Sequence, residues 1–263
     1  MRLTFLGTGS AMPTGDRMQT GLLLERATGT AADGASGRDV RERDGDDRLL
    51  VDCGSGVLHT LARTDVGYEG VDTVLLTHHH VDHVSDLLAL LKARWLAGEE
   101  TLTVVGPTGT ADLVSDLLAV HDYLEGRVDL TLRDVDAGSF DVAGFDVDAV
   151  ETRHSMHGLA YRFDDALAFS GDTEAFRGMA EFADGCPVLV HDCSFPDEVD
   201  VSNHPTPTQL GESLSGVDVD DLYLTHLYPH TDGKHREMQA AIEEHFDGHV
   251  AFARDGLAVE IEA

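Results

Sequence analysis

Cysteine is scarce in this chain of 263 residues, with three in total, at positions 53, 186 and 193. No two of them form a Cys-x-x-Cys pair, which excludes a cysteine-based zinc ribbon and a disulfide-stapled scaffold. Long apolar runs are missing too, since none reaches the roughly 18 residues that span a bilayer. The first residues lack a signal-peptide pattern. We therefore expect a cytoplasmic protein that makes no membrane contact.

Positive charge is the second scarcity. The chain has 18 Lys and Arg against 49 Asp and Glu, so its net charge is −31. Thirty-three of the acids are Asp, and lysine occurs only at positions 92 and 234. Such a surface stays hydrated where salt screens its charges and is typical of halophilic proteins. It argues against the broad basic face that nucleases usually present to phosphates, but otherwise indicates little about partners.

Hydrophobic residues make up 42 % of the chain, enough for a substantial core. Segments typical of strands lie at 3–6, 22–24, 49–51, 71–76, 102–105, 128–133, 145–151, 158–163, 166–170, 187–190, 222–225 and 257–261. Segments typical of helices lie at 82–96, 111–123, 174–183, 207–214 and 235–246. The alternation predicts stacked sheets with helices outside. We expect one domain over residues 1–263, with a flexible, aperiodic insertion at 28–47.

Four residues that can bind metal follow the predicted strand 71–76 directly. His78 and His80 stand two apart in an extended loop, so they project to the same side, while Asp82 and His83 open the next helix. Strand-to-helix loops are where α/β proteins build their sites. The pattern offers two imidazoles for one metal, and a carboxylate plus an imidazole for another. Zinc suits these ligands best, with manganese or iron as alternatives. A solvated polar loop is the competing interpretation.

The segment His78-x-His80-x-Asp82-His83 resembles the signature of the metallo-β-lactamase superfamily, and the resemblance extends over nearly the whole chain. It implies an α/β fold: a four-layer αββα sandwich of two mixed β-sheets. It also implies that Asp52 is structural. The remaining ligands match three positions, each after a predicted strand: His154, Asp172 and His226. The implied first metal site is His78, His80 and His154, the second is Asp82, His83 and His226, and Asp172 bridges them.

The start of the chain narrows the resemblance to the ribonuclease Z branch. Phe5-Leu6-Gly7-Thr8-Gly9-Ser10-Ala11 resembles that branch's opening, and His191-Asp192-Cys193-Ser194 stands where it has His-Glu-Ala-Thr. His204, in the sequence Asn203-His204-Pro205-Thr206, matches the histidine that protonates the leaving group in that branch.

This resemblance implies hydrolysis of a phosphodiester by a hydroxide that bridges two divalent metal ions about 3.5–4 Å apart. Asp82 is then both ligand and catalytic base, and His204 is the catalytic acid. The carboxylate of Asp192 is expected to support His204 from outside the metal site.

Two departures bear on the substrate. The branch carries a long arm after a Gly-Pro that grips tRNA, but only 46 residues separate Pro107 from His154 here. The usual Ser-x-Arg-Tyr after the last ligand reads Leu227-Tyr228-Pro229-His230. We expect a ribonuclease Z-like enzyme without the arm. Its partner is a phosphodiester, either an RNA 3′ end or a small cyclic nucleotide or cyclic phosphate. A homodimer is expected by analogy with related enzymes.

Other classes of function fit less well. A thiolester or lactam hydrolase shares the fold, but Asp172, the 191–194 segment and His204 favour the phosphodiesterase branch. A flavin-dependent di-iron oxidoreductase needs an acid in place of His80 and a flavin domain. A binding module with a degenerate site would lack a ligand, and none is missing. No role is assigned to His191 or His230. His79 and His157 are expected to bind no metal. The following are expected to be solvated: His121, His235, His245 and His249.

Overall fold

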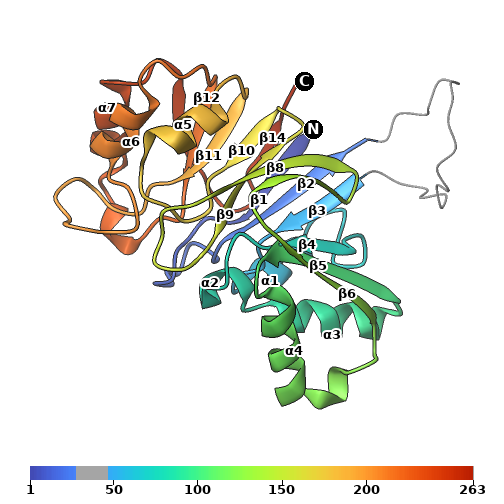
Figure 1. The fold of residues 1–263 in the computed structure, drawn as a ribbon. Helices are drawn as coiled ribbons and strands as arrows, with labels where there is room; N and C mark the ends of the chain where they lie inside the picture. Colours follow the sequence, from blue (N-terminus) through green and yellow to red (C-terminus); the bar gives the residue numbers. More distant parts are fainter. Residues whose placement is uncertain (28–46, 263) are drawn as a thin grey trace, which may run out of the picture.

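The computed structural model describes residues 1–27 and 47–262, and it shows two seven-stranded β-sheets stacked with helices outside them (Figure 1). The first sheet has the order β14-β1-β2-β3-β4-β5-β6. Its strands are β1 (Arg2–Gly7), β2 (Gly21–Arg26), β3 (Asp47–Val51), β4 (Thr73–Leu75), β5 (Thr101–Pro107), β6 (Asp129–Val135) and β14 (Ala258–Glu260). The second has the order β13-β12-β11-β10-β9-β8-β7. Its strands are β7 (Gly138–Val142), β8 (Phe145–Glu151), β9 (Leu159–Phe163), β10 (Leu167–Phe169), β11 (Val188–Asp192), β12 (Asp221–Thr225) and β13 (His249–Phe252).

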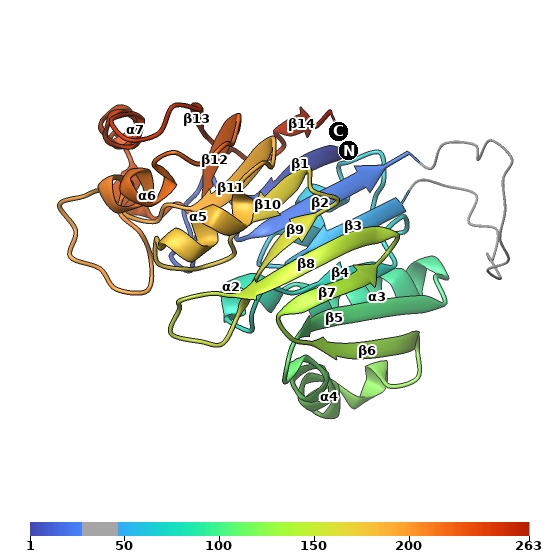
Figure 2. The same cartoon turned by 45° about the horizontal axis from the view of Figure 1, so that its top comes forward.

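Helices cover the outer face of each sheet (Figure 2). Against the first sheet lie α1 (Val57–Leu61), α2 (Val81–Val84), α3 (Leu87–Ala97), α4 (Thr110–Val120) and the short 3₁₀ helix η1 (Asp122–Leu124). Against the second lie α5 (Arg177–Ala183), α6 (Pro207–Leu214) and α7 (His235–Glu243). The 3₁₀ helix η2 (Pro229–Thr231) follows β12. None of the described helices combines the length and the apolar character needed to cross a membrane.

Both faces of the central strands are buried, which explains their continuous apolar runs. In β2, Leu22 and Leu24 face the core between the sheets, whereas Leu23 faces the core under the helices. Side chains alternate along a strand, so a run of three leucines supplies both layers. A third core lies between the second sheet and its helices. The predicted four-layer αββα architecture is confirmed.

Parallel pairing brings the chemically active loops to one edge of the sandwich. Strands β3, β4 and β5 run parallel in the first sheet, as do β10, β11, β12 and β13 in the second. Their carboxyl ends therefore point the same way within each sheet, and α2 begins at that edge (Figure 1). Gly9, in the loop after β1, forms an isolated β-bridge with Leu227, in the loop after β12. This bridge connects a loop of the first sheet to a loop of the second.

The prediction of one helix over 82–96 was wrong, because the chain breaks between α2 and α3. The Asp86 carboxylate accepts hydrogen bonds from the backbone N–H groups of Gly56 (2.9 Å) and Leu58 (3.0 Å). It thereby caps α1, a helix that the sequence did not reveal. Strands β7 and β13 were missed as well. Of the predicted insertion 28–47, Asp47 belongs to β3, and the remainder lies outside the described residues.

Candidate metal centre

Seven side chains predicted as ligands converge at the edge where the strand ends meet. The donor atoms within each of two groups lie within 4.8 Å of one another. The first group consists of His78, His80, His154 and Asp172, and the second of Asp82, His83, Asp172 and His226. Asp172 is common to both. Helix α2 supplies Asp82 and His83, and the loops after β4, β8, β10 and β12 supply the others, so both sheets contribute to the centre.

Three imidazole nitrogens define the first group. His78 Nε2 lies 3.0 Å from His80 Nδ1, which in turn lies 3.1 Å from His154 Nε2. The Asp172 Oδ2 atom is 3.7 Å from His78 Nε2 and 3.9 Å from His154 Nε2. Such close approach of lone pairs is favourable when a cation lies among them.

The second group contains two carboxylates and two imidazoles. His226 Nε2 lies 3.1 Å from Asp82 Oδ2 and 3.2 Å from Asp172 Oδ2. His83 Nε2 lies 3.4 Å from Asp172 Oδ1. Burial disfavours the charge on Asp172, yet the surrounding imidazoles lower the pKa of its carboxyl well below the usual value. The carboxylate is therefore ionised and available as a ligand.

Hydrogen bonds outside the two groups fix which nitrogen of each histidine faces the centre. His83 Nδ1 lies 2.7 Å from Asp52 Oδ2, and His154 Nδ1 lies 2.9 Å from the carbonyl of Asn203. Both partners can only accept, so both Nδ1 atoms donate. Each Nε2 is then free to present a lone pair to a cation.

Two hydroxyl groups act in the same way. Thr77 Oγ1 donates to Asp52 Oδ2 (2.8 Å) and can accept from His78 Nδ1 at 3.1 Å. Ser194 Oγ donates to Asp192 Oδ1 (2.5 Å) and can accept from His226 Nδ1 at 3.0 Å. His80 is the exception, because its Nδ1 atom faces the group.

The fit to a metal can be tested at His83. Its Nε2 atom is buried and has no hydrogen-bond partner among the described residues. Burial opposes the imidazolium form, but Asp172 and Asp52 raise the pKa of His83 well above its usual value. The negative charge of these carboxylates therefore favours a proton or a metal cation at His83 Nε2. With the neighbouring imidazoles and carboxylates, this donor set fits a divalent metal.

The loop after β3 holds the second group in place. Asp52 Oδ1 accepts the backbone N–H of Thr77 at 2.8 Å, and Cys53 donates its backbone N–H to the carbonyl of His83. A Cβ added to Gly54 would lie 2.1 Å from the carbonyl oxygen of Asp82. Glycine at position 54 is thus what permits this close contact.

Replacing Asp52 by Asn is expected to weaken metal binding about 10- to 100-fold, because the charge that orients His83 Nδ1 is lost. Competition with a chromogenic chelator measures the affinity. Asp86→Asn is the matched control, since Asp86 caps α1 beside the same loop but touches no ligand. Equal metal affinity in Asp52→Asn and the wild type would rule out this orienting role.

His204, which the sequence predicted as the catalytic acid, lies at the rim of the centre. Its Nδ1 atom is 2.6 Å from Asp192 Oδ2, and its ring stacks on His226 with centroids 5.3 Å apart. Burial disfavours the charged ring, but Asp192 outweighs it and raises the pKa of His204 to about 9. The expected support of His204 by the Asp192 carboxylate is present.

A cavity of about 410 Å³ opens over both donor groups. His204 and Tyr228 contribute to its wall, beside residues of both metal groups. Three non-glycine residues here have a positive φ: Asp52 (59°), Asn203 (69°) and His226 (56°). Such backbone strain gathers at functional sites.

The other histidines lie away from the donor groups. His79 Nε2 contacts Thr110 Oγ1 at 2.7 Å, and His191 is buried with Nδ1 donating to the carbonyl of Asp192. His235 is not solvated as predicted, since it stacks on Phe252 with ring centroids 4.0 Å apart. The remaining histidines are exposed: His59, His121, His157, His230, His245 and His249.

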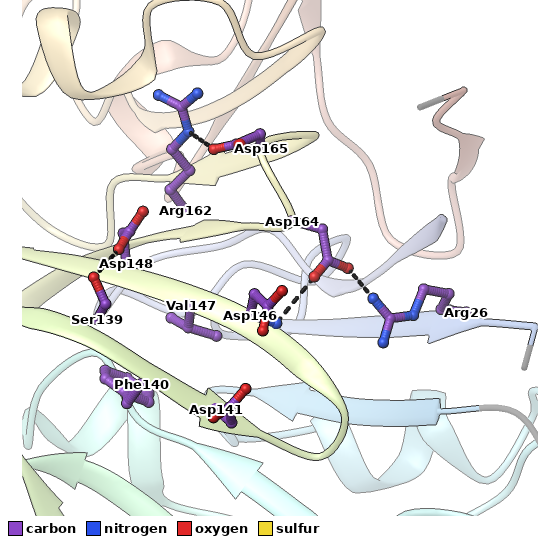
Figure 3. Close-up of a pocket in the computed structure, with 10 residues that line it drawn as sticks. All are labelled: Arg26, Ser139, Phe140, Asp141, Asp146, Val147, Asp148, Arg162, Asp164 and Asp165. Atoms are coloured by element: carbon purple, nitrogen blue, oxygen red, sulfur yellow. Dashed lines mark hydrogen bonds and ion pairs between the residues drawn. The ribbon is translucent and has the colours of Figure 1, made fainter. Parts of the chain in front are cut away.

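A different depression, of about 560 Å³, lies over β7, β8 and β9 (Figure 3). It contains none of the predicted site residues. Asp164 accepts the backbone N–H of Asp146 at 2.9 Å and pairs with Arg26, while Asp165 pairs with Arg162. Both guanidiniums of this lining are thus already paired, and the lining contains no imidazole, so the histidine-lined cavity is the better candidate site.

Known proteins resemble the chain over its whole length. A family profile described as the β-lactamase superfamily domain matches residues 47–227. Ribonuclease Z of Methanopyrus kandleri is 30 % identical over 301 aligned positions, which cover 98 % of this chain and 97 % of that protein. Ribonuclease Z of Mycobacterium avium is 29 % identical over 295 positions, covering 100 % and 99 %.

Solved structures show the same fold. The metallo-β-lactamase fold protein YhfI from Bacillus subtilis has a TM-score of 0.79 at 23 % identity, covering 98 % of both chains. The short form of human tRNase Z has a TM-score of 0.74 at 20 % identity, covering 100 % of both. At such identities the likeness concerns the fold alone.

Proposed function

The chain belongs to the metallo-β-lactamase superfamily and within it to the ribonuclease Z group, and on this premise we propose that it cleaves phosphodiester bonds in RNA at a centre of two divalent metal ions. The enzyme is a metal-dependent hydrolase. The number of ions, their identity as zinc and the RNA substrate are our proposal.

The observation that carries the proposal is the position of Asp172. One of its oxygens lies 3.7 Å from His78 Nε2 in the first group and 3.2 Å from His226 Nε2 in the second. A carboxylate shared in this way suits two cations better than one. We assign His78, His80 and His154 to the first ion, Asp82, His83 and His226 to the second, and Asp172 to both. Zinc suits the imidazole-rich set best, with manganese or iron as alternatives.

The protein's own groups then have separate tasks. Bound cations supply a water of lowered pKa and neutralise charge that develops on the phosphate. Asp82 lines the cavity and accepts the proton of the attacking water. His204 is bonded to Asp192 through Nδ1, so its Nε2–H is the group that can donate to the leaving oxygen. Asp192 holds that ring in one orientation.

Two observations support an enzyme without the tRNA-gripping arm. After β5 ends at Pro107, α4 begins at Thr110, and the chain up to His154 is occupied by α4, η1, β6, β7 and β8. The alignments with the curated relatives run to 295 and 301 positions, more than the 263 residues present here. The relatives therefore contain segments for which this chain has no counterpart.

Cleavage of a 3′-extended tRNA precursor in molar KCl, with zinc or manganese, tests the proposal. We expect the wild type to cut the precursor at the discriminator base and Asp82→Ala to leave it intact, because Asp82 is both ligand and base. A chromogenic phosphodiester is assayed in parallel. If wild type with bound metal cleaves neither substrate, a phosphodiesterase is the wrong proposal.

A small cyclic nucleotide or cyclic phosphate is the second candidate substrate. The compact segment between Pro107 and His154 and the modest cavity of about 410 Å³ favour it. An intact tRNA precursor together with a consumed chromogenic diester would select this candidate. The assignment of the metal ligands is unaffected by that choice.

A further inference from the structure

A second cavity adjoins the metal cavity, and His204 forms part of the wall of both. This second cavity measures about 500 Å³ and lies where the segment before α5 meets α6 and the loop at residues 201–204. Ser202 also lines both cavities. Helices α5 and α6 are in contact and lie next to each other in both views (Figures 1 and 2).

The shared wall places the second cavity relative to the groups that take part in the proposed reaction. In the proposed function, on which this inference rests, His204 protonates the leaving oxygen. The leaving oxygen must then approach the His204 ring, and the atoms attached to it continue past that ring. The second cavity adjoins that ring and offers space for those atoms.

The residues that line the second cavity indicate the chemical class of the leaving group. Phe176 contributes an aromatic ring, and the guanidinium carbon of Arg153 lies 4.2 Å from the ring centroid. Ser202, Gln209 and Ser213 add neutral polar groups. An aromatic ring beside hydroxyl and amide groups suits a nucleobase with its ribose.

The charges in this lining disfavour a phosphate. Glu174 and Glu212 both contribute carboxylates. The one guanidinium in the lining, among the residues that the structure describes, belongs to Arg177. It pairs with Glu181 at 3.1 Å and donates to the carbonyls of Ser213 and Ser215. A neutral nucleoside is therefore accepted more readily than a further anionic group.

Two hydrogen bonds link the two cavities. Glu174 Oε1 accepts the backbone N–H of Asn203 at 3.2 Å, and the carbonyl of Asn203 accepts from His154 Nδ1 at 2.9 Å. The segment just before α5 is thus connected to a ligand of the first metal group. Phe176 itself is extended (φ −153°, ψ 150°), so α5 begins only at Arg177.

We propose that this second cavity binds the nucleoside on the leaving-group side of the scissile phosphate, with its base stacked on Phe176. Phe176 is then a specificity-determining residue that recognises a base without reading its sequence, because every base has a π-face.

Three dinucleoside monophosphates test this inference. One has both bases, and each of the other two is abasic at one end. The product that carries the phosphate shows which end leaves. We expect the wild type to have a kcat/KM about tenfold lower when the leaving-side base is missing. Phe176→Ala should lower kcat/KM for the complete substrate to that level and leave the substrate that is abasic at the leaving end unchanged.

Phe140→Ala is the matched control, because Phe140 is also half-buried and also has a guanidinium on its ring, at 5.3 Å from Arg133. It should keep the wild-type base preference. Phe176→Leu preserves apolar packing and should lose the preference as Phe176→Ala does. If both Phe176 variants keep it, the inference is wrong while the proposed function stands. If metal-loaded wild type cleaves none of the dinucleoside monophosphates but still cleaves the tRNA precursor or the chromogenic diester, the inference alone is wrong. If it cleaves none of all these substrates, both are wrong.

Discussion

Asp172→Ala is expected to lose bound metal and to lower turnover of a phosphodiester by about 10³-fold or more, because metal ions supply several kcal/mol of the catalysis in such sites. Asp172 is the one carboxylate that belongs to both donor groups, and it is buried among their imidazoles. Its removal takes a ligand from each group in a single substitution. No other residue of the centre has this property among the described residues.

Elemental analysis of the purified variant, together with steady-state kinetics, checks this expectation. Asp165→Ala serves as the control, since Asp165 is a surface carboxylate paired with Arg162. It should retain wild-type metal content and activity. Two equivalents of tightly held metal in Asp172→Ala would show that the carboxylate bridges nothing.

His204→Ala should behave in the opposite way, with metal content preserved and kcat lowered by about 10²–10⁴-fold. Its side chain belongs to the rim of the cavity and contacts Asp192 through Nδ1, whereas both metal groups are complete without it. The loss should be largest for leaving groups of high pKa, because these need a proton as the bond breaks.

Comparison of two substrates isolates this role. The leaving group of a dinucleotide is a nucleoside alkoxide, so kcat for this substrate should fall strongly in His204→Ala. The leaving group of a p-nitrophenyl diester is a stabilised phenolate, so kcat for this substrate should be nearly unchanged. Asp192→Asn should show the same pattern more weakly, since the His204 ring is kept but loses the carboxylate that orients it and raises its pKa. Equal impairment of both substrates, or an emptied metal site, would contradict the assignment as catalytic acid.

The sequence predicted those residues of the centre that directly follow predicted strands. His78, His80, Asp82 and His83 follow one strand, and the other three predicted ligands each follow another, so the topology of the sheets brings them to one edge. The structure places all seven together. As metal ligands they remain a proposal. The alternation of strands and helices predicted stacked sheets with helices outside, and the family resemblance implied the four-layer αββα fold class, which is confirmed.

Partners from distant segments were beyond such reasoning. The carbonyl of Asn203 orients His154 from 49 residues away, and a backbone carbonyl has no sequence signature. Ser194 stood beside the predicted Asp192, but only the fold shows that it contacts His226. At the break between α2 and α3, Asp86 accepts hydrogen bonds from the α1 backbone, a contact between separate segments that helical periodicity does not encode.

The centre also joins the two sheets, because the loops after β4 belong to one half of the sandwich and those after β8, β10 and β12 to the other. Any ion that binds there cross-links the halves and binds only when they are assembled. Ion concentration and folding stability are therefore thermodynamically linked. When the free ion concentration is 100 times the Kd of a site, binding adds about 2.7 kcal/mol to the free energy of unfolding. In a chain with a net charge of −31, the same cations also offset the mutual repulsion of acids between the halves. Metal binding at the candidate centre would therefore stabilise the folded state in addition to its proposed role in the reaction.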